Sequence, residues 1–239
     1  MKKYDVYGLG NALVDKEFEV TDEFLQAAGI QKGMMALIEE DQLHSLLKDL
    51  TDRFGEKKRA SGGSAANTIV TLSQFGGKAF YSCKVANDDI GDFYSKDLQD
   101  ANVDSNLDGG RDQGTTGRCL VMVTPDAERT MNTFLGITTD LSEKELNEEA
   151  IKNSSYLYIE GYLSTSDTAR AAVKKARAIA KEHNVKTALT FSDPAMVQFF
   201  RGGVDELLGD GVDLLFCNED EAMHYTSKGS AEEAAESIK

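Results

Sequence analysis

Residues 61–67 read Ser-Gly-Gly-Ser-Ala-Ala-Asn and precede an apolar, helix-like run, which indicates a ligand-binding turn at the start of a helix. Two adjacent glycines let the backbone turn sharply and approach a ligand closely, because neither carries a Cβ. Ser64 and Asn67 lie three residues apart, so in a first helical turn they face the same way beside free N–H groups. The cluster favours a hydroxyl-rich small molecule as the ligand. The alternative is an ordinary Gly-Gly turn in which Ser64 is the helix N-cap.

Two other stretches accompany this turn. Residues 8–15 read Gly-Leu-Gly-Asn-Ala-Leu-Val-Asp, and residues 216–222 read Phe-Cys-Asn-Glu-Asp-Glu-Ala. In this order and spacing, the three stretches resemble the PfkB family of carbohydrate and nucleoside kinases, also called the ribokinase-like family. Gly-Gly-Ser-x-x-Asn and residues Arg129–Gly136 are most similar to the adenosine kinase branch. The resemblance runs over nearly the whole chain, and it implies an α/β fold: a doubly wound, mostly parallel sheet with helices on both faces and a small β-sheet lid.

One segment of that family has no counterpart here. The family's catalytic aspartate lies in a C-terminal Asp-Thr-x-Gly-Ala-Gly-Asp segment, whose strand-to-helix turn also supplies the anion hole. Two late stretches, Leu208–Gly211 and Tyr225–Gly229, lack the Gly-x-Gly-Asp pattern. The sequence stops at Lys239, inside what reads as a helix. We therefore expect a C-terminally incomplete piece of a longer kinase, with no catalytic base among its residues.

Composition and charge restrict the classes of molecule that this chain is expected to bind. The chain has 26 Lys and Arg against 41 Asp and Glu, a net charge of −15. Such a surface repels nucleic acid and anionic membranes, so neither is expected as a partner. The three cysteines are dispersed without a Cys-x-x-Cys pair, which favours reduced thiols in a cytoplasm over a disulfide scaffold or a zinc site. No run approaches the ~18 apolar residues of a membrane helix. We expect a cytoplasmic monomer or homodimer that binds a small-molecule nucleoside or sugar.

Strands and helices alternate along the chain, a pattern typical of a parallel sheet with helical crossovers. Residues 1–239 are expected to form one α/β kinase core, with a discontinuous β-lid drawn from residues near 12–38 and 115–136. The lid is expected to contain Val14–Val20, Gly33–Ile38 and a hairpin over Arg118–Phe134. The other expected strands are Tyr4–Gly10, Ala79–Val85, Tyr156–Glu160, Lys186–Phe191 and Asp213–Phe216. Helices are expected at Asp41–Phe54, Ser64–Phe75, Asp88–Asp100, Thr165–His183, Val204–Leu208 and Glu219–His224, and from Ser230 onward.

Two other nucleotide-binding motifs are excluded. Gly8-Leu9-Gly10 opens like a dinucleotide fingerprint, but Leu13 stands in place of the third glycine and a strand rather than a helix follows. No Gly-x-x-x-x-Gly-Lys-Ser/Thr phosphate loop occurs in the sequence.

The resemblance implies a sugar pocket in which Asp15 accepts hydrogen bonds from two sugar hydroxyls. A carboxylate whose hydroxyl partner is missing in a deoxy analogue rejects that analogue by roughly 10⁴–10⁵ in the best cases. A solvated carboxylate is the alternative, since Asp15 lies on the polar side of an alternating strand. The resemblance implies that the same pocket also contains Asn11, Gly62, Gly63, Ser64 and Asn67. The resemblance implies that the base end of the pocket is lined by Met35, Leu37, Leu135 and Tyr162. Ordinary core packing is the alternative for these side chains.

At the nucleotide end, the resemblance implies that Arg129 reaches the transferring phosphate, with a solvent-facing lid cation as the alternative. Asn218 and Glu221 match the family's Asn-x-x-Glu motif, which organises magnesium through water and contacts the nucleotide phosphates. The same spacing forms a helix capping box, and both roles can hold together. Thr190, Asn218 and Glu221 are thus the expected cofactor-binding residues, with Glu221 holding Mg²⁺ through water. ATP and Mg²⁺ are the implied cofactors, and a monovalent cation is left open.

The implied reaction transfers the γ-phosphoryl group of MgATP to a primary hydroxyl, the 5′-hydroxyl of an adenosine-like nucleoside. Met35 and Leu37 favour a nucleoside over a free sugar such as ribose or fructose, which the same pocket could also hold. A non-catalytic sugar- or nucleoside-binding protein is the second alternative. We expect the 239-residue chain alone to be inactive or to bind substrate weakly.

Overall fold

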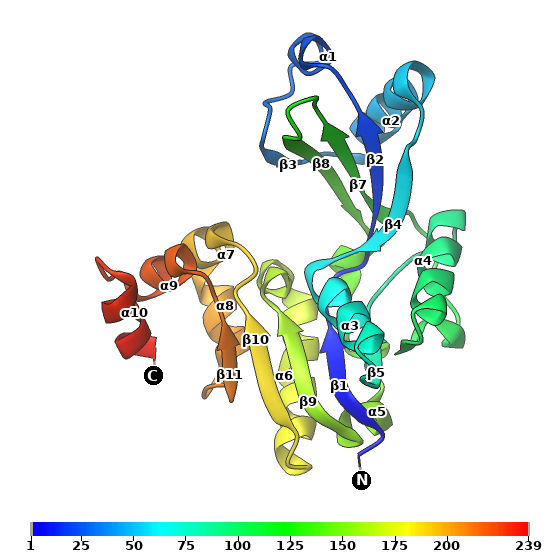
Figure 1. Cartoon of the computed structure of the whole chain (residues 1–239). Coiled ribbons are helices and arrows are strands. Elements are labelled where there is room, and N and C mark those ends of the chain that lie inside the picture. The colour runs from blue at the N-terminus through cyan, green and yellow to red at the C-terminus, as the bar shows by residue number, and fades with distance from the viewer. Residues whose placement is uncertain (1, 239) are drawn as a thin grey trace.

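The computed structural model describes residues 2–238, and its centre is a six-stranded parallel sheet (Figure 1). The strand order is β11-β10-β9-β1-β5-β6, and each neighbouring pair is parallel. The first strand of the chain lies inside the sheet, so later strands are added on both sides of it, as in a doubly wound fold. The predicted fold class is confirmed. The strands are β1 (Tyr4–Leu9), β5 (Ala79–Ser82), β6 (Asp104–Ser105), β9 (Ser154–Glu160), β10 (Lys186–Thr190) and β11 (Leu214–Phe216).

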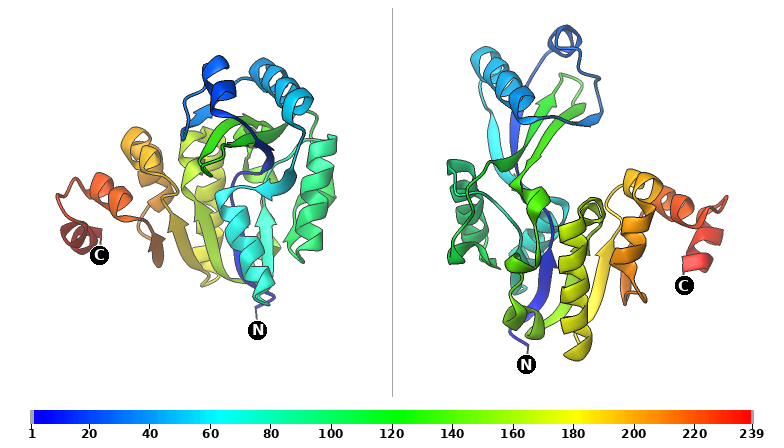
Figure 2. Two further views of the ribbon diagram at one scale, coloured as in Figure 1. Left: turned by 45° about the horizontal axis from the view of Figure 1, so that its top comes forward. Right: turned by 180° about the vertical axis from the view of Figure 1, so that it is seen from behind.

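Helices cover both faces of this sheet, because successive strand residues point to opposite sides. On β9, Leu157 and Ile159 join one core cluster, whereas Tyr158 belongs to the other. The second cluster packs under α3 (Ser64–Gln74) and α4 (Asp89–Asp100). In the right-hand view of Figure 2, α6 runs along the opposite face. The helices over the first cluster are α5 (Glu148–Lys152), α6 (Asp167–Glu182), α7 (Pro194–Phe199) and α8 (Arg201–Leu208).

A second sheet of five strands stands beyond the carboxyl edge of the first, and with two helices it forms the lid (Figure 1). The strand order is β3-β8-β7-β2-β4, with β7 and β8 paired as the expected hairpin. The outer face is closed by α1 (Asp22–Ala27) and α2 (Glu40–Phe54), whose apolar side chains pack against Phe18 and Leu120. The strands are β2 (Leu13–Glu19), β3 (Met35–Leu37), β4 (Lys58–Gly62), β7 (Thr116–Val123) and β8 (Arg129–Gly136).

Among the short elements that the sequence does not predict are α1, β4, α5 and α7. β4 reads Lys-Arg-Ala-Ser-Gly and shows no alternation of apolar and polar residues. It is an edge strand that forms through its pairing with β2. α1 begins at Thr21, whose hydroxyl accepts a hydrogen bond from the Phe24 N–H, and α7 begins at Pro194 behind an Asp193 cap. Elements of five or six residues contain too few positions to show a clear period.

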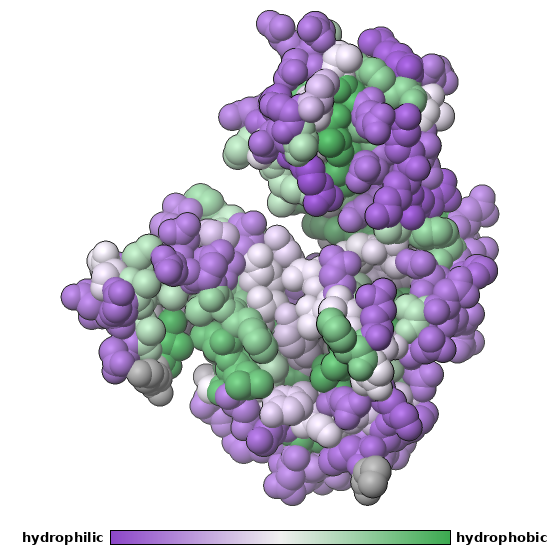
Figure 3. Space-filling model, in the orientation of Figure 1, coloured by the Kyte–Doolittle hydropathy of each residue, from purple (hydrophilic) through white to green (hydrophobic). Residues whose placement is uncertain are grey.

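Beyond the β11 edge of the main sheet, α9 (Glu219–Thr226) packs on α7, and α10 (Ala231–Ile238) packs on α9 (Figure 1). They leave part of the sheet face open. Leu214 and Phe216 on β11 are 44% and 50% exposed, and Figure 3 shows hydrophobic surface over β10 and β11. Apolar area that a sheet normally buries under another layer is therefore accessible here. No helix within residues 2–238 is long and apolar enough to cross a membrane.

Truncation of the fully buried Phe18 tests the separate core of the lid. Phe18→Ala leaves a cavity among α1, α2 and the outer face of the lid sheet, so the free energy of unfolding is expected to fall by about 3–5 kcal/mol. Equilibrium urea unfolding followed by circular dichroism measures the change. Phe75→Ala is the matched control, because the Phe75 side chain is almost fully exposed. An equal loss in the two variants would contradict the packing described here.

Candidate active site

The candidate site lies between the carboxyl edge of the main sheet and the inner face of the lid. Parallel strands end at the same edge, and ligands of open α/β sheets bind beyond it. The strand register defines the inner face of the lid as a row running across all five strands. The Thr133 hydroxyl donates a hydrogen bond to the Cys119 Sγ at 3.3 Å within this row, opposite to the helix-covered face. In strand order the row is Leu37, Thr133, Cys119, Asp15 and Ala60.

Asp15 contributes a carboxylate to this face beside the core sheet. Its side chain is half-buried, and burial raises its pKa while the nearby positive charge of Arg129 opposes that shift. It accepts no hydrogen bond from any residue in the described part of the chain. A Cβ on Gly62 would lie 2.7 Å from the Asp15 Oδ1, so the carboxylate packs directly on this glycine. Asp15 is therefore positioned by packing and has both oxygens available for a ligand.

The Gly-Gly turn opens α3 as the sequence predicts. Gly63 has φ 111°, a conformation that favours glycine, and a Cβ there would clash with the Asn11 carbonyl oxygen. The Gly63 carbonyl accepts the first helical hydrogen bond, from the Asn67 N–H at 3.0 Å. Ser64 is half-buried and Asn67 is exposed. Their side chains make no hydrogen bond to other residues of the described chain, so both remain available at the mouth of the helix.

Asn11 has a more structural position than the sequence suggests. Its carbonyl oxygen accepts a hydrogen bond from the Tyr81 hydroxyl at 2.8 Å, and its side-chain oxygen accepts one from the Thr138 hydroxyl at 3.3 Å. The polar groups of the Asn11 backbone and side chain also lie near the Glu160 carboxylate and favour its charged form. The residue therefore joins the end of β1 to β5, β9 and the turn that follows β8.

Sequence reasoning missed Glu160, which lies under the pocket at the end of β9. Its side chain is fully buried, and its Oε2 accepts a hydrogen bond from the Ala65 N–H at 2.8 Å. Burial raises its pKa from 4.5 to about 7, although the hydrogen bond from Ala65 and the polar groups of Asn11 favour the charged form. The available signal was an acidic residue at the carboxyl end of an apolar strand, where sheet-edge sites are built.

The residues expected at the base end are divided between the lid and the core. Met35 and Leu37 on β3 are 44% and 62% exposed, and Leu135 on β8 is half-buried. Tyr162 packs against the main core cluster and lies beside Asp193, whose charge adds to the effect of burial in raising the tyrosine pKa. Thr190 ends β10, and its hydroxyl accepts a hydrogen bond from the Ser192 N–H at 3.2 Å. Met35, Leu37 and Leu135 therefore offer apolar surface on the lid. Tyr162 instead packs in the core, which is the alternative role that the sequence left open.

Asn218 and Glu221 form the capping box at the start of α9. The Asn218 side chain accepts a hydrogen bond from the Glu221 N–H at 2.8 Å, and the Glu221 Oε2 accepts one from the Asn218 N–H at 3.0 Å. Glu221 is buried, and burial and the charge of Asp193 both raise its pKa. Residues 2–238 contain no group of three or more His, Cys, Asp and Glu that could hold a metal directly. The Glu221 carboxylate, which lies near Asp193, is still suited to bind magnesium through water molecules that the ion retains.

Comparison with known proteins gives consistent relatives. Residues 30–239 match the family described as pfkB family carbohydrate kinase. Guanosine-inosine kinase of Escherichia coli (strain K12) is 28% identical over 230 residues, which are 93% of this chain and 53% of that protein. A probable sugar kinase from Rhizobium etli CFN 42 has a TM-score of 0.88 at 33% identity, covering 100% of this chain and 71% of its own. Adenosine kinase from Sinorhizobium meliloti has a TM-score of 0.82 at 35% identity, covering 97% and 70%.

A parallel sheet that presents its carboxyl edge to a separate β-lid places this chain in the ribokinase-like class of α/β proteins. The family match covers most of the residues, so the chain belongs to the pfkB family of carbohydrate kinases. It spans about half the length of the curated relatives that it matches first.

Gly63→Ala tests the close approach that shapes the pocket. The added Cβ clashes with the Asn11 carbonyl at a positive φ, so the free energy of unfolding should fall by about 1–3 kcal/mol. Urea unfolding measures it. Gly202→Ala is the control: it lies in α8 with open space around its Cβ position, and the change there should stabilise by up to about 1 kcal/mol. Similar effects of the two substitutions would refute the special role of Gly63.

Glu160 should make stability pH-dependent. Its folded pKa of about 7 lies above its ordinary 4.5, so between these values the folded state holds a proton that the unfolded state has released. Stability from this group is therefore complete below pH 4.5 and is lost as pH rises through 7. Relative to Glu160→Gln, the wild-type free energy of unfolding should fall by about 3 kcal/mol across this window. Urea unfolding at several pH values checks this, with the exposed Glu149→Gln as control. Parallel curves for wild type and Glu160→Gln would contradict it.

Proposed function

We propose that this chain carries the acceptor site and lid of an ATP-dependent kinase that transfers the γ-phosphoryl group of MgATP to a primary hydroxyl of an adenosine-like nucleoside. The observation that carries the proposal is the half-buried Asp15 carboxylate on the inner face of the lid, which accepts no hydrogen bond from residues 2–238. The family membership and the kinase relatives support the reaction class. Because the chain spans only part of those relatives, we assign the activity to the intact gene product.

At the sugar end of the proposed pocket, groups that form hydrogen bonds would contact the sugar from opposite sides. In our proposal Asp15 accepts hydrogen bonds from two neighbouring hydroxyls, and Asn67 and Ser64 contact the ring from the start of α3. Gly62 and Gly63 allow the sugar to approach the backbone. Asn11 belongs to the same pocket and is oriented by Glu160. Such a polar arrangement discriminates against deoxy analogues, since each missing hydroxyl leaves a partly buried group unpaired.

The base end favours a nucleoside over a free sugar. Met35 and Leu37 present exposed apolar side chains on the edge strand of the lid, and Leu135 lies on the strand beside it. A planar base would cover this surface, whereas a free sugar would leave it exposed to water. A free-sugar kinase is the second candidate, because the Asp15–Asn67 pocket suits ribose or fructose and a structural relative is described as a probable sugar kinase.

At the phosphate end, Arg129 would neutralise charge on the transferring group, because it is exposed on the same lid face as Asp15. Thr190, Asn218 and Glu221 would hold ATP and water-bound magnesium at the ends of β10 and β11. Bound MgATP supplies the phosphoryl group and neutralises charge as it is transferred. The 239 residues contain no Asp-Thr-x-Gly-Ala-Gly-Asp segment, so we assign no catalytic base within them. All three cysteines are free and Cys217 is exposed, which supports our assignment to the cytoplasm.

A phosphorylation panel on the intact gene product tests this proposal. Adenosine, 2′-deoxyadenosine, guanosine, inosine, cytidine, ribose and fructose are each offered with MgATP, and product is quantified for wild type and Asp15→Asn. We expect transfer to a nucleoside, a loss in Asp15→Asn of about 10²-fold or more in kcat/KM, and poor use of 2′-deoxyadenosine. Glu17→Gln is the control, since Glu17 lies on the same strand and face.

The outcomes separate the candidates. Transfer to a free sugar alone would retain the family and replace the nucleoside with that sugar. Full activity of Asp15→Asn would refute the pocket. The 239-residue chain assayed alone should bind adenosine weakly and turn nothing over, so measurable turnover would show that these residues do contain a catalytic base.

A further inference from the structure

We propose that Lys84, which follows β5, is a positioning residue that fixes the lid against the main sheet and thereby sets the geometry of the acceptor pocket. The effect on substrate rests on the proposed function, whereas the effect on the lid does not. The lid is joined to the core partly through the segment that leads into β7 and the segment that leaves β8. Lys84 contacts both segments.

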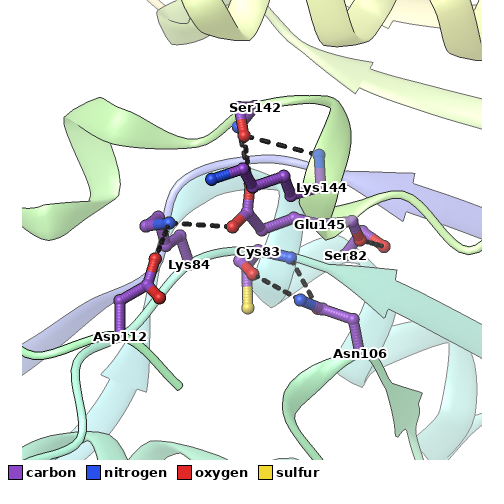
Figure 4. A network of polar contacts seen from close by, with 8 residues as sticks. All are labelled: Ser82, Cys83, Lys84, Asn106, Asp112, Ser142, Lys144 and Glu145. Carbon is purple, nitrogen blue, oxygen red and sulfur yellow. Dashed lines mark hydrogen bonds and ion pairs between the residues drawn. The ribbon is translucent and has the colours of Figure 1, made fainter. Parts of the chain in front are cut away.

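The Lys84 side chain is 9% exposed and is held between two carboxylates (Figure 4). Its Nζ lies 2.7 Å from the Asp112 Oδ2 and 2.8 Å from the Glu145 Oε1. Asp112 precedes β7, and Glu145 lies in a 3₁₀ turn after β8. One buried cation therefore ties the two connections of the lid hairpin to the end of a core strand.

The segment that leaves β8 is fixed at both side chain and backbone. The second Glu145 oxygen accepts hydrogen bonds from the Ser142 N–H at 2.7 Å and the Ser142 hydroxyl at 2.9 Å. The Glu145 carbonyl accepts one from the Ser82 hydroxyl at 2.8 Å, and Ser82 is the last residue of β5. Figure 4 shows the Glu145 carboxylate between Ser142 and the Lys84 ammonium group. Glu145 therefore cannot move with the lid unless these bonds break.

The segment that leads into β7 is held by the residues just after Lys84. The Asn87 N–H donates to the Asp112 carbonyl at 2.8 Å. The Asp88 carboxylate accepts hydrogen bonds from the Thr116 hydroxyl at 2.6 Å and the Thr116 N–H at 3.0 Å, and Thr116 is the first residue of β7. Asp88 also caps α4 through the Gly91 N–H at 2.7 Å. The lid hairpin is thus anchored directly to the start of a core helix.

The energetics favour a geometric role for Lys84. Removing an ammonium group from water is costly, so a buried ion pair adds little net stability compared with an apolar side chain of similar size. Burial lowers the Lys84 pKa, but the hydrogen bonds to Asp112 and Glu145 outweigh this and raise it, so the group stays charged. What the ion pair adds is direction, because a cation with two fixed partners permits one arrangement of the segments that carry them.

The pocket depends on that arrangement because its two halves come from different layers. Asp15 and Arg129 belong to the lid, whereas Gly63, Ser64 and Asn67 open a core helix. A rotation of the lid changes the distance between the carboxylate and the helix start. Misplacement of such groups by about 1 Å is enough to weaken substrate positioning strongly.

Distance measurement between lid and core tests the proposal without any ligand. Nitroxide labels are placed by Lys48→Cys on α2 and Lys181→Cys on α6, both largely exposed positions, in a Cys217→Ser background. The other two cysteines are buried. Double electron–electron resonance should give one narrow distance distribution in the otherwise wild-type chain and a shifted or broader one in Lys84→Met.

Lys16→Met is the matched control. Lys16 is also 9% exposed and ion-paired, 2.9 Å from the Glu56 Oε2, but that pair lies within the lid. It should leave the distribution unchanged. Asp112→Asn is the second variant, because its side chain is 65% exposed and its loss cannot disrupt the core. Asp112→Asn should also shift or broaden the distance distribution. If Lys84→Met does not fold, the result for Asp112→Asn tests the proposal. Wild-type distributions in the folded variants, or an equal change in Lys16→Met, would overturn the proposal.

Adenosine titration calorimetry on the intact gene product with the same substitutions tests the consequence for the pocket. Lys84→Met should lower the affinity by about tenfold, a usual coupling between linked elements, while Lys16→Met keeps it. If the intact wild type binds no adenosine but the distances change as expected, the positioning role stands and the nucleoside assignment fails. If adenosine binds with unchanged affinity and unchanged distances in both test variants, the positioning role fails and the nucleoside assignment stands.

Discussion

The Glu160 carboxylate joins the parts of the molecule that meet beneath the candidate pocket. It lies at the end of the strand next to β1, accepts a hydrogen bond from the Ala65 N–H at the start of α3, and lies near the polar groups of Asn11, where the chain leaves β1 for the lid. A buried carboxylate is stable only with such donors, since burial without hydrogen bonds is costly. The same bonds therefore satisfy the carboxyl group and fix the Gly-Gly turn against the sheet edge.

The two faces of the lid have opposite functions, and strand alternation separates them. Phe18 and Leu120 point outward and are sealed by α1 and α2, which gives the lid a core of its own. Asp15 and Leu37 point inward and stay accessible. A lid with an independent core can be held rigid while it is attached to the main sheet through a few connections. The orientation of the lid is then decided at those connections, where Lys84 lies.

The net charge of −15 makes the placement of individual cations informative. Lys84 is buried between carboxylates and is neutralised there, so it serves structure. Arg129 is exposed on the inner face of the lid, near enough to Asp15 to affect its pKa. An anionic phosphate donor entering an acidic protein needs such a local positive charge, because the overall field opposes its approach.

The sequence alone determined the alternation of strands and helices, the β7–β8 hairpin, the Gly-Gly turn and the capping box at Asn218, because each is set by residues close together in the chain. It also indicated Asp15 and Asn67 as pocket residues through the motif resemblance, and their roles stay predictions. Only the tertiary structure revealed Glu160 as the partner of α3, 95 residues away from Ala65, and Lys84 as the link between the two lid connections. Strand order, which local periodicity does not specify, decides which distant residues meet. The short elements β4 and α1 have the same origin, since sheet pairing and lid packing stabilise what five or six residues cannot form alone.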